Sequence, residues 1–585
     1  MKDYLFTISL IILLAIFYLG LPDLDRTTPP LRKGRSKKAH VFSIEKYDII
    51  AIAVITVIFG IVDFWKLGNT ESPESFVRLG ESTAILSLEE DKSPMSLMFF
   101  TGVSEGTYDI DFSEDGQNYT RITSYTQSYA DVLRWVNISS YNSMKPKYIR
   151  ISCEGNAFLG EVGLLDENNE FIDFSCDVPQ LCDEQEKLCS SNTYMNSSYF
   201  DEIYHARTAW EHLNAVYPYE VSHPPLGKII IGLGISLFGM TPFGWRFSGT
   251  LFGVLMIPVI YVFSKELFGS LRVSVCTTLI LATDFMHFVQ TRIATIDSYA
   301  VFFILLMYLF MYRYLSGRKL SDLAICGIFF GLGAASKWTC LYAGAGLALL
   351  WLIDRILHRD EGLKPLIKNI CFCLLFFLLV PCVIYYLSYI PYGIALNIKP
   401  VFSKAYFRTV IDNQKFMFTY HSGLSAEHPY SSKWYQWILD IRPILYYLEY
   451  FDDGTRSSFG AFLNPILCWG GLVALFVLMY CALLKKEKRA AFILIGYLAQ
   501  LIPWMFITRL TFEYHYFPCS VFLVLALGYV FSLMESGTKH WKAYVYSFVA
   551  VSTGLFIMFM PVLSGIRINT YTATRLLHWL KTWPF

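Results

Sequence analysis

Charged residues are scarce in this chain. Only 16% of the 585 residues are Asp, Glu, Lys or Arg, whereas 54% are hydrophobic and 17% are aromatic. This composition excludes a soluble protein of several domains, whose surface needs more charged side chains. The 48 cations balance the 48 anions, so no net charge points to nucleic acid as a partner. Many apolar runs instead approach the ~20 residues with which a helix crosses a bilayer.

Cysteine is rare outside the apolar runs. Nine of the 13 cysteines lie in or beside such runs, where a thiol usually acts as a small buried hydrophobe. The other four lie in a polar region: Cys153, Cys176, Cys182 and Cys189. If that region is outside the cytoplasm, these four cysteines can form one or two disulfides. The sequence does not show which cysteines pair.

Twelve apolar runs are predicted to cross a membrane as helices. They are residues 4–20, 47–65, 245–264, 272–288, 297–315, 322–336, 339–356, 368–390, 461–483, 490–507, 517–534 and 543–563. The first lacks a small-residue cleavage site and leads into the basic segment Arg32–Lys38. This is typical of a retained anchor with a cytoplasmic basic loop, and not of a removed signal peptide.

The basic residues between the spans favour one orientation. If Arg32–Lys38 is cytoplasmic, every other cytoplasmic loop is basic too, as the positive-inside rule requires. The apolar stretch Ile229–Met240 is too short to span a bilayer. Counting it as a span would place those loops outside, so we predict an interfacial or re-entrant helix there. The outer face then holds residues 66–244, 289–296, 391–460 and 508–517 and the turn near Lys337.

Residues 72–196 interrupt the apolar pattern with short alternating stretches between turn residues. This pattern predicts an antiparallel β-sandwich. Phe112–Thr120, Leu133-Arg-Trp135 and Gly160–Asp166 resemble the galactose-binding-like (discoidin-type) jelly roll. Sugar binding, with Trp135 and tyrosines as stacking platforms, and an architectural or protein-docking role both stay open. Three Asn-x-Ser/Thr sequons matter only in a eukaryotic lumen; they begin at Asn118, Asn137 and Asn196.

Two adjacent carboxylates, Asp201 and Glu202, follow this region. Because carboxylates are costly near hydrocarbon unless they are paired or reactive, we interpret them as a candidate functional site. Five cations stand near outer ends of spans, where few are expected: Arg246, Arg292, Lys337, Arg442 and Arg509. Any one of them could reach interfacial water or lipid headgroups. Their convergence with the acidic pair is better explained by a bound anion.

Group transfer from a lipid-linked phosphate to a hydroxyl would use these parts. A carboxylate such as Asp201 takes the acceptor proton, helped by partial burial or by Glu202. Cations neutralise the leaving phosphate, and an apolar groove between spans holds the polyprenyl tail. His421, His428 and the acidic pair lack the spacing of metal ligands, so we expect no divalent metal and no other cofactor.

Several motifs occur in the order of a known family. They are Phe200-Asp-Glu, His223-Pro-Pro-Leu-Gly-Lys, Gly244-Trp-Arg-Phe-Ser, Asp284 with Arg292-Ile-Ala-Thr-Ile-Asp, Ser336-Lys-Trp, His428-Pro-Tyr-Ser-Ser-Lys-Trp and Tyr514-His-Tyr-Phe-Pro. From about Tyr199 to Met534 the chain resembles the protein O-mannosyltransferases, glycosyltransferase family 39 of the GT-C superfamily. The His-Pro-Tyr-Ser-Ser stretch and the absence of an inserted MIR domain are similar to the bacterial branch.

The resemblance implies an inverting transfer of mannose from polyprenyl phosphate mannose to Ser or Thr of an exported protein. It implies that Asp201 is the general base and that Glu202 orders the acceptor or the base. The residues it implies for the donor phosphate and sugar are Arg246, Arg292, Lys337, His223, Lys228, Asp297, Arg509, Tyr514 and His515. His223 is equally explained as a structural histidine, and Asp297 as a partner of a helix dipole. The aromatic residues Tyr514 and His515 are also explained as interfacial anchors.

The implied partners are membrane lipid, the lipid-linked sugar donor and an exported protein acceptor, with no nucleic acid; a homodimer stays open. The implied location is the plasma membrane of a bacterium, with several spans and an extracytoplasmic active site. One alternative is a GT-C enzyme that uses the same donor and a lipid or cell-wall polymer as acceptor. Another is a lipid-linked sugar transporter, which would need polar residues near the bilayer midplane. A sugar-binding receptor would need only one span.

The predicted fold class is thus a polytopic α-helical membrane protein with the GT-C fold, about 12 transmembrane helices and an extracytoplasmic β-sandwich. The predicted domains are an extra anchor and basic loop (1–46), the first shared helix (47–71), the β-sandwich (72–196), the catalytic core (197–390), an extracytoplasmic loop (391–460) and the C-terminal helices (461–585). The anchor and the β-sandwich depart from the family, which leaves the acceptor less defined than the reaction.

Overall fold

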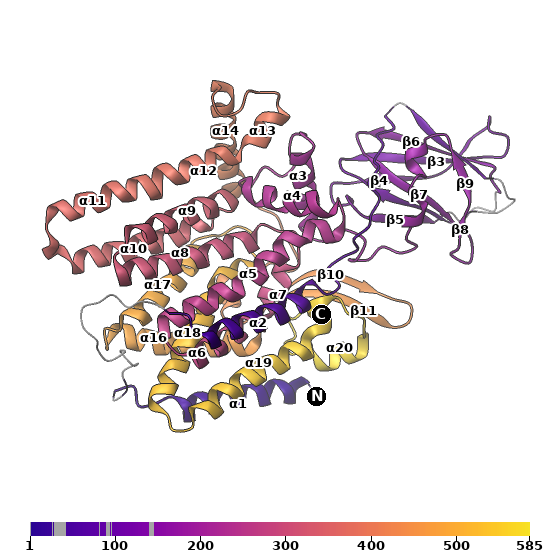
Figure 1. Ribbon diagram of the computed structural model, residues 1–585. Helices are drawn as coiled ribbons and strands as arrows, with labels where there is room; N and C mark the ends of the chain where they lie inside the picture. Colours follow the sequence, from indigo (N-terminus) through magenta and orange to yellow (C-terminus); the bar gives the residue numbers. More distant parts are fainter. Residues whose placement is uncertain are drawn as a thin grey trace. The chain divides into compact units, whose positions relative to one another are not determined.

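The computed structural model describes residues 2–25, 27, 43–80, 82–88, 94, 96–139 and 145–585. The predicted cytoplasmic loop Arg32–Lys38 lies outside these residues. The chain forms two compact units, shown as ribbons in Figure 1. The helical unit combines Met1–Trp65, Ala215–Ile229 and Gly249–Phe585, and the β-containing unit combines Lys66–Asn214 and Ile230–Ser248. The domain limits expected from the sequence stay predictions.

Nine helical segments in the described residues are long and apolar enough to cross a membrane, and a tenth is bent by 57°. The nine are α1 (Lys2–Gly20), α2 (Lys46–Phe64), α5 (Pro242–Phe268), α8 (Asp297–Gly317), α10 (Cys340–Leu357), Leu363–Ala395, α16 (Pro465–Leu483), Glu513–Gly537 and α19 (Trp541–Ser564). The bent segment joins α6 (Leu271–Ala282) to α7 (Phe285–Thr291). These helices confirm a polytopic membrane protein.

The remaining two predicted spans are shorter helices. They are α9 (Leu320–Ser336, 17 residues) and α17 (Lys488–Leu501, 14 residues). The short apolar stretch before Met240 forms α4 (Leu226–Phe238), whose 13 residues are too few to cross a bilayer. The segment Leu363–Ala395 consists of α11 (Leu363–Leu374), a π-helical turn (Leu375–Leu379), α12 (Val380–Ser388) and α13 (Ile390–Ala395).

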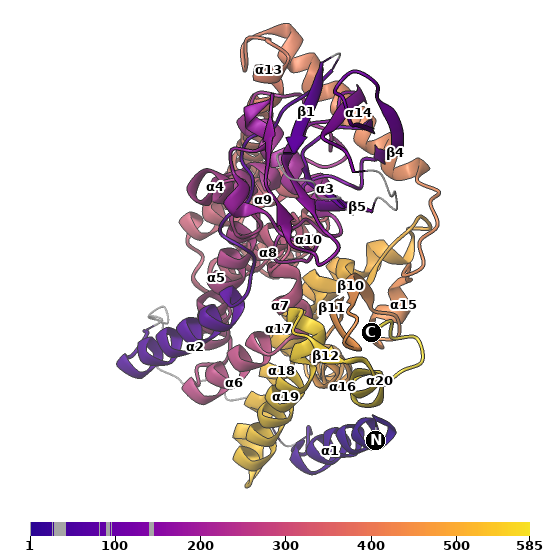
Figure 2. The same ribbon diagram turned by 90° about the vertical axis from the view of Figure 1, so that its right-hand side faces the viewer.

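Helix α18 (Phe517–Gly537) lies at the centre of the helical unit. Its most apolar window is completely buried, as expected of a helix that is hydrophobic on every side. It packs against α6, α16 and α17. Gly496 of α17 allows this close approach, because a Cβ atom there would lie 2.2 Å from the ring of Phe522. The N-terminal helix α1 packs along α19, as both views show (Figures 1 and 2), so the extra anchor is part of this unit.

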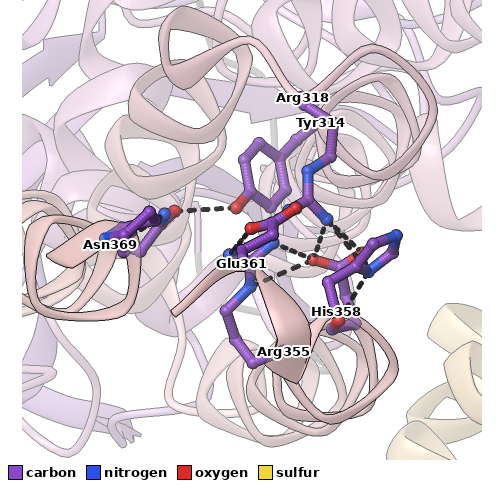
Figure 3. A network of polar contacts seen from close by, with 8 residues as sticks. Tyr314, Arg318, Arg355, His358, Glu361 and Asn369 are labelled. Atoms are coloured by element: carbon purple, nitrogen blue, oxygen red, sulfur yellow. Dashed lines mark hydrogen bonds and ion pairs between the residues drawn. The ribbon is translucent and has the colours of Figure 1, made fainter. Parts of the chain in front are cut away.

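Charged residues join the ends of α8, α10 and α11 (Figure 3). Arg318 ends α8 in the left-handed conformation, and its guanidinium binds Asp354 at 2.7 Å and Glu361 at 2.7 Å. Arg355 also reaches Glu361, at 3.3 Å. The hydroxyl of Tyr314 donates to Asn369 of α11 at 2.8 Å. The network fixes these helix ends beside the loops that the charge pattern places in the cytoplasm.

The segment predicted as a long outer loop (391–460) contains regular structure. It includes α14 (Lys404–Gly423), α15 (Trp434–Trp437), β10 (Ile444–Tyr450) and most of β11 (Thr455–Ala461). β10 and β11 form an antiparallel hairpin, and the short strand β12 (Ile568–Asn569) adds to β11. Thus the C-terminal end of the chain is tied to this outer segment.

The β-containing unit holds two antiparallel sheets, with strand orders β4-β3-β6-β1-β9 and β5-β2-β7-β8. The strands are β1 (Thr83–Leu88), β2 (Ser96–Thr101), β3 (Gly106–Ser113), β4 (Thr120–Gln127), β5 (Trp135–Ser139), β6 (Tyr148–Gly155), β7 (Leu159–Leu165), β8 (Phe171–Ile172) and β9 (Phe174–Cys176). One apolar core contains residues of both sheets, such as Phe99, Ile110 and Val162. The predicted antiparallel pairing is confirmed; a galactose-binding-like identity stays a prediction.

Two expectations about side chains of this unit change. Trp135 is only 2% exposed and packs edge-on against Phe100 at 5.3 Å, so it is a core residue and not a platform for sugar stacking. The four cysteines of the unit are free thiols, and no disulfide forms among the residues that the structure describes. The stability of this unit therefore depends on its apolar core.

Stability of the β-containing unit is expected to fall as pH rises from about 5 to 8. Glu161 on β7 is completely buried, and burial raises its pKa from 4.5 to about 7, helped by Asp183 and Glu184. Because the folded state holds this proton more tightly than the unfolded chain, the stabilisation is complete below pH 4.5 and is lost as pH passes 7. Hydrogen exchange of β7, measured in the whole protein, should show this loss of stability as pH rises. The Glu161→Gln variant should show a weaker dependence of stability on pH. If stability depended on pH equally in wild type and in the variant, Glu161 would not be the group responsible.

Candidate functional site

The acidic pair lies at the start of helix α3 (Glu202–Leu213). Phe200 has a φ of 48°, and this turn places Asp201 at the N-cap position and Glu202 in the first helical turn. Carboxylates are favoured there by the helix dipole. Glu202 is completely buried, whereas Asp201 is partly exposed. The two carboxylates therefore have different surroundings although they are adjacent in sequence.

Glu202 is bound by Arg246 in a fully buried ion pair. Nε of Arg246 donates to Oε1 at 2.7 Å and Nη2 donates to Oε2 at 2.8 Å. The other N–H groups of Arg246 donate to the carbonyls of Leu67 (2.9 Å), Tyr194 (2.6 Å) and Ser197 (2.9 Å). A guanidinium has five N–H donors, so all are used within this unit. The contact of Arg246 with a donor phosphate therefore stays a prediction, and in this arrangement its N–H groups are directed to Glu202 and to three backbone carbonyls.

The N–H donors of Lys228 are also all used by acceptors in its own unit. Its ammonium group is completely buried and donates to the carbonyl (2.9 Å) and the carboxylate (2.5 Å) of Glu220 and to the carbonyl of His223 (2.9 Å). Three N–H donors thus have three acceptors. The predicted contact of Lys228 with the donor is not supported, and its charge fixes the turn that carries His223. Nδ1 of His223 lies 3.1 Å from Glu220.

Lys337 follows α9 and pairs with Asp297 in the first turn of α8. The ammonium nitrogen lies 2.7 Å from the carboxylate of Asp297 and 5.5 Å from the ring centre of Tyr514. Asp297 thus lies at the helix start and pairs with the lysine, and its contact with the donor stays a prediction. Arg292 is 2% exposed and donates to the carbonyls of Asp63 and Trp65, so it fixes the end of α2.

His223, Lys337, His421 and Arg509 form what we name the outer cationic cluster. His421 of α14 stacks edge-on with His223 at 5.1 Å, and its Nε2–H donates to the carbonyl of Ser222 at 2.8 Å. Burial, together with the neighbouring His223, Arg509 and Lys337, lowers the pKa of His421 to about 4. His421 is therefore neutral at physiological pH and adds no positive charge to the cluster.

Aromatic side chains lie beside this cluster. The rings of Tyr514 and His515 stack at 4.5 Å, and His515 packs against Trp504 at 4.4 Å and is parallel to Trp437 at 6.0 Å. His515 is only 7% exposed. The structure therefore places Tyr514 next to Lys337, as the donor-site hypothesis requires, and makes His515 part of a packed aromatic layer.

Several residues near the site carried no sequence signal. Glu220 and His421 complete contacts described above, yet no motif includes them. Asp440 and Glu513 are both completely buried, and their carboxyl groups influence each other. Burial raises the pKa of Asp440 to about 7. The two residues are 73 positions apart in the sequence, so only the structure shows that they influence each other.

Two family models match the chain. One is described as dolichyl-phosphate-mannose-protein mannosyltransferase and matches residues 222–386; the other is the C-terminal four TMM region of protein-O-mannosyltransferase and matches residues 406–583. Both matches lie outside the two β-sheets and outside Asp201 and Glu202. The contacts of Lys337 and Tyr514 lie inside them.

Curated relatives and a solved structure that resemble this chain are likewise named as protein mannosyltransferases. The polyprenol-phosphate-mannose–protein mannosyltransferase of Mycolicibacterium smegmatis is 25% identical over 460 residues, which cover 67% of this chain and 89% of the relative. The Corynebacterium glutamicum protein of that name is 23% identical over 467 residues, covering 67% and 90%. The S. cerevisiae protein O-mannosyltransferase Pmt1-Pmt2 complex has a similar fold, with a TM-score of 0.59, 14% identity and coverage of 66% of this chain and 89% of the matched chain. The chain therefore belongs to the protein O-mannosyltransferase family, as its motifs predicted.

Proposed function

We propose that this membrane protein transfers mannose, with inversion, from polyprenyl phosphate mannose to Ser or Thr hydroxyls of exported proteins. The names of its bacterial relatives support the donor and the protein acceptor. The proposed location is a bacterial plasma membrane with the site on its outer face, which agrees with the basic loops on the other side. The observation that carries the proposal is the division of roles in the acidic pair: Arg246 neutralises Glu202 and leaves the partly exposed Asp201 as the base.

In the proposed step Asp201 accepts the proton of the acceptor hydroxyl. The hydroxyl oxygen attacks the anomeric carbon from the face opposite the phosphate. The bond between that carbon and the phosphate oxygen breaks, and the polyprenyl phosphate leaves with the electron pair. Mannose is thereby joined to the acceptor through the new C–O bond with inverted configuration.

Lys337 and Arg509 are the proposed cations for the leaving phosphate. Both belong to the outer cationic cluster, and Tyr514 beside Lys337 supplies a flat apolar surface for the sugar. Arg246, Arg292 and Lys228 are assigned positioning roles instead, because their donors are directed to backbone carbonyls and buried carboxylates. A reaction without a metal ion, and a homodimeric assembly, stay predictions.

The test is a transfer assay with the purified whole protein in nanodiscs. Radiolabelled polyprenyl phosphate mannose is supplied with a mixture of Ser/Thr peptides, and label is expected in the peptides. If peptides stay unlabelled but donor is consumed when cell-envelope extract is added, the acceptor is a lipid or a wall polymer and the proposed protein acceptor is wrong.

Lys337→Gln is expected to raise KM for the donor about tenfold or more, with a smaller change in KM for the peptide. A hydrogen bond to a charged group contributes about 1.5–3 kcal/mol, and the variant removes one from the phosphate. The double variant Lys337→Gln with Asp297→Asn is the control, because it leaves no unpaired carboxylate. Lys485→Gln, which removes an exposed cation paired with Asp25, should change nothing. A normal donor KM in the double variant would exclude Lys337 from phosphate binding.

A further inference from the structure

A polar cavity lies between two outer segments of the helical unit. Residues 426–442 and 508–511 enclose about 660 Å³. Backbone N–H of Ser432 donates to the carbonyl of Thr511 at 2.8 Å, and the hydroxyl of Thr511 donates to the carbonyl of Ser432 at 2.6 Å. These two bonds hold the segments together, so the cavity has a fixed wall.

Three cations line this cavity: Lys433, Arg442 and Arg509. Each contacts a backbone carbonyl of a neighbouring residue in the wall, namely Thr508 (3.4 Å), Pro429 (2.7 Å) and Leu510 (3.1 Å). Within the part of the chain that the structure describes, none of the three forms an ion pair with a carboxylate. Glu427 also lines the cavity, but it is exposed and pairs with none of them. The lining therefore holds an excess of positive charge that an anionic ligand would balance.

The lining fits a polypeptide better than the donor. Ser431, Gln436 and Thr508 offer hydrogen bonds suited to a peptide backbone, whereas only Ala426, Pro429 and Leu510 are apolar, too few for a polyprenyl chain. The volume is also much larger than a phosphate group needs. Arg442 can bind a carboxylate through two parallel N–H bonds. Since the charge of Arg509 also acts on His421, the cavity adjoins the outer cationic cluster.

We propose that this cavity binds an acidic side chain of the acceptor polypeptide, so that the enzyme prefers Ser or Thr near Asp or Glu. Lys433 and Arg442 supply the charges that select the acceptor, and Arg509 lies where the cavity meets the donor cations. This inference rests on the proposed function and specifies which proteins it modifies.

The test uses the whole protein and two peptides that differ only in Asp or Asn beside the same Ser. Peptide binding is measured by fluorescence anisotropy and transfer is measured separately. Wild type is expected to bind the Asp peptide at least fivefold more tightly and to show the same ratio in KM. The variant Lys433→Gln with Arg442→Gln should bind both peptides equally and keep its donor KM. Arg408→Gln, an exposed change on α14, is the matched control and should keep the preference.

Equal binding of the two peptides by wild type would overturn the inference. A raised donor KM in the double variant, with the peptide preference kept, would instead assign the cavity to the donor phosphate and would also overturn it. If the double variant loses the tighter binding of the Asp peptide that wild type shows, the cavity binds the acidic side chain even when no mannose reaches either peptide. In that case only the proposed function fails. The kept donor KM of the double variant shows that it is folded, and Arg442→Lys, which keeps the charge, should retain part of the preference.

Discussion

Replacing Asp201 by Asn is expected to slow mannose transfer by about 10²–10⁴-fold, the usual contribution of a general base. Asn has nearly the shape of Asp, and the side chain of Asp201 makes no capping hydrogen bond that the change could break, so α3 should start at the same place. The amide cannot accept the hydroxyl proton, whereas Lys337, Tyr514 and the apolar helices are unchanged. Donor binding should therefore stay near its wild-type value while kcat falls. Turnover with labelled donor and peptide gives kcat, and donor binding is measured without acceptor.

Asp412→Asn is the matched control for this experiment. Asp412 is an exposed carboxylate on α14 whose partners are Arg408 and Lys415, so its loss should leave transfer unchanged. If Glu202 acts only by positioning its neighbours, Glu202→Asp should slow transfer less than Asp201→Asn does. Normal turnover of Asp201→Asn would mean that another group takes the proton.

The sequence predicted the membrane spans well because each depends on local composition. A run of apolar residues needs no distant partner to form a helix in lipid, and every predicted span contains a helix. The alternating pattern of residues 72–196 likewise predicted antiparallel strands. The sequence could not tell that Trp135 is buried, because both faces of β5 are covered where it begins: Trp135 packs in a second apolar cluster against Phe76 and Leu188, segments outside the strands.

The roles of the charged residues were harder to predict. The family motifs assign Arg246 and Lys228 to the donor, but a motif does not show how many of their N–H groups are already bonded. Three of the acceptors of Arg246 are carbonyls at positions 67, 194 and 197, and a carbonyl is present at every residue. The same limit hid the buried carboxyl groups of Asp440 and Glu513, which influence each other although their segments share no pattern.

Breaking the ion pair between Glu202 and Arg246 is expected to have the largest effect on folding. Both side chains are completely buried, and removal of one partner leaves an uncompensated charge, which typically costs about 3–5 kcal/mol. Glu202→Gln leaves the guanidinium of Arg246 with four neutral acceptors and without its charged partner. Arg246→Met also removes the bonds to three backbone carbonyls. We expect a clearly lower melting temperature for each single variant in detergent.

The double variant Glu202→Gln with Arg246→Met separates charge from position. It contains no unpaired buried charge, so it should regain part of the stability lost by either single variant. It should remain poorly active, because the turn from Phe200 to Glu202 that places Asp201 is no longer held by the carboxylate contacts of Arg246. Thermal unfolding and kcat are measured for all four proteins. If the double variant transferred mannose at the wild-type rate, the pair would serve folding alone, and the position of Asp201 would have to be set by other contacts of α3.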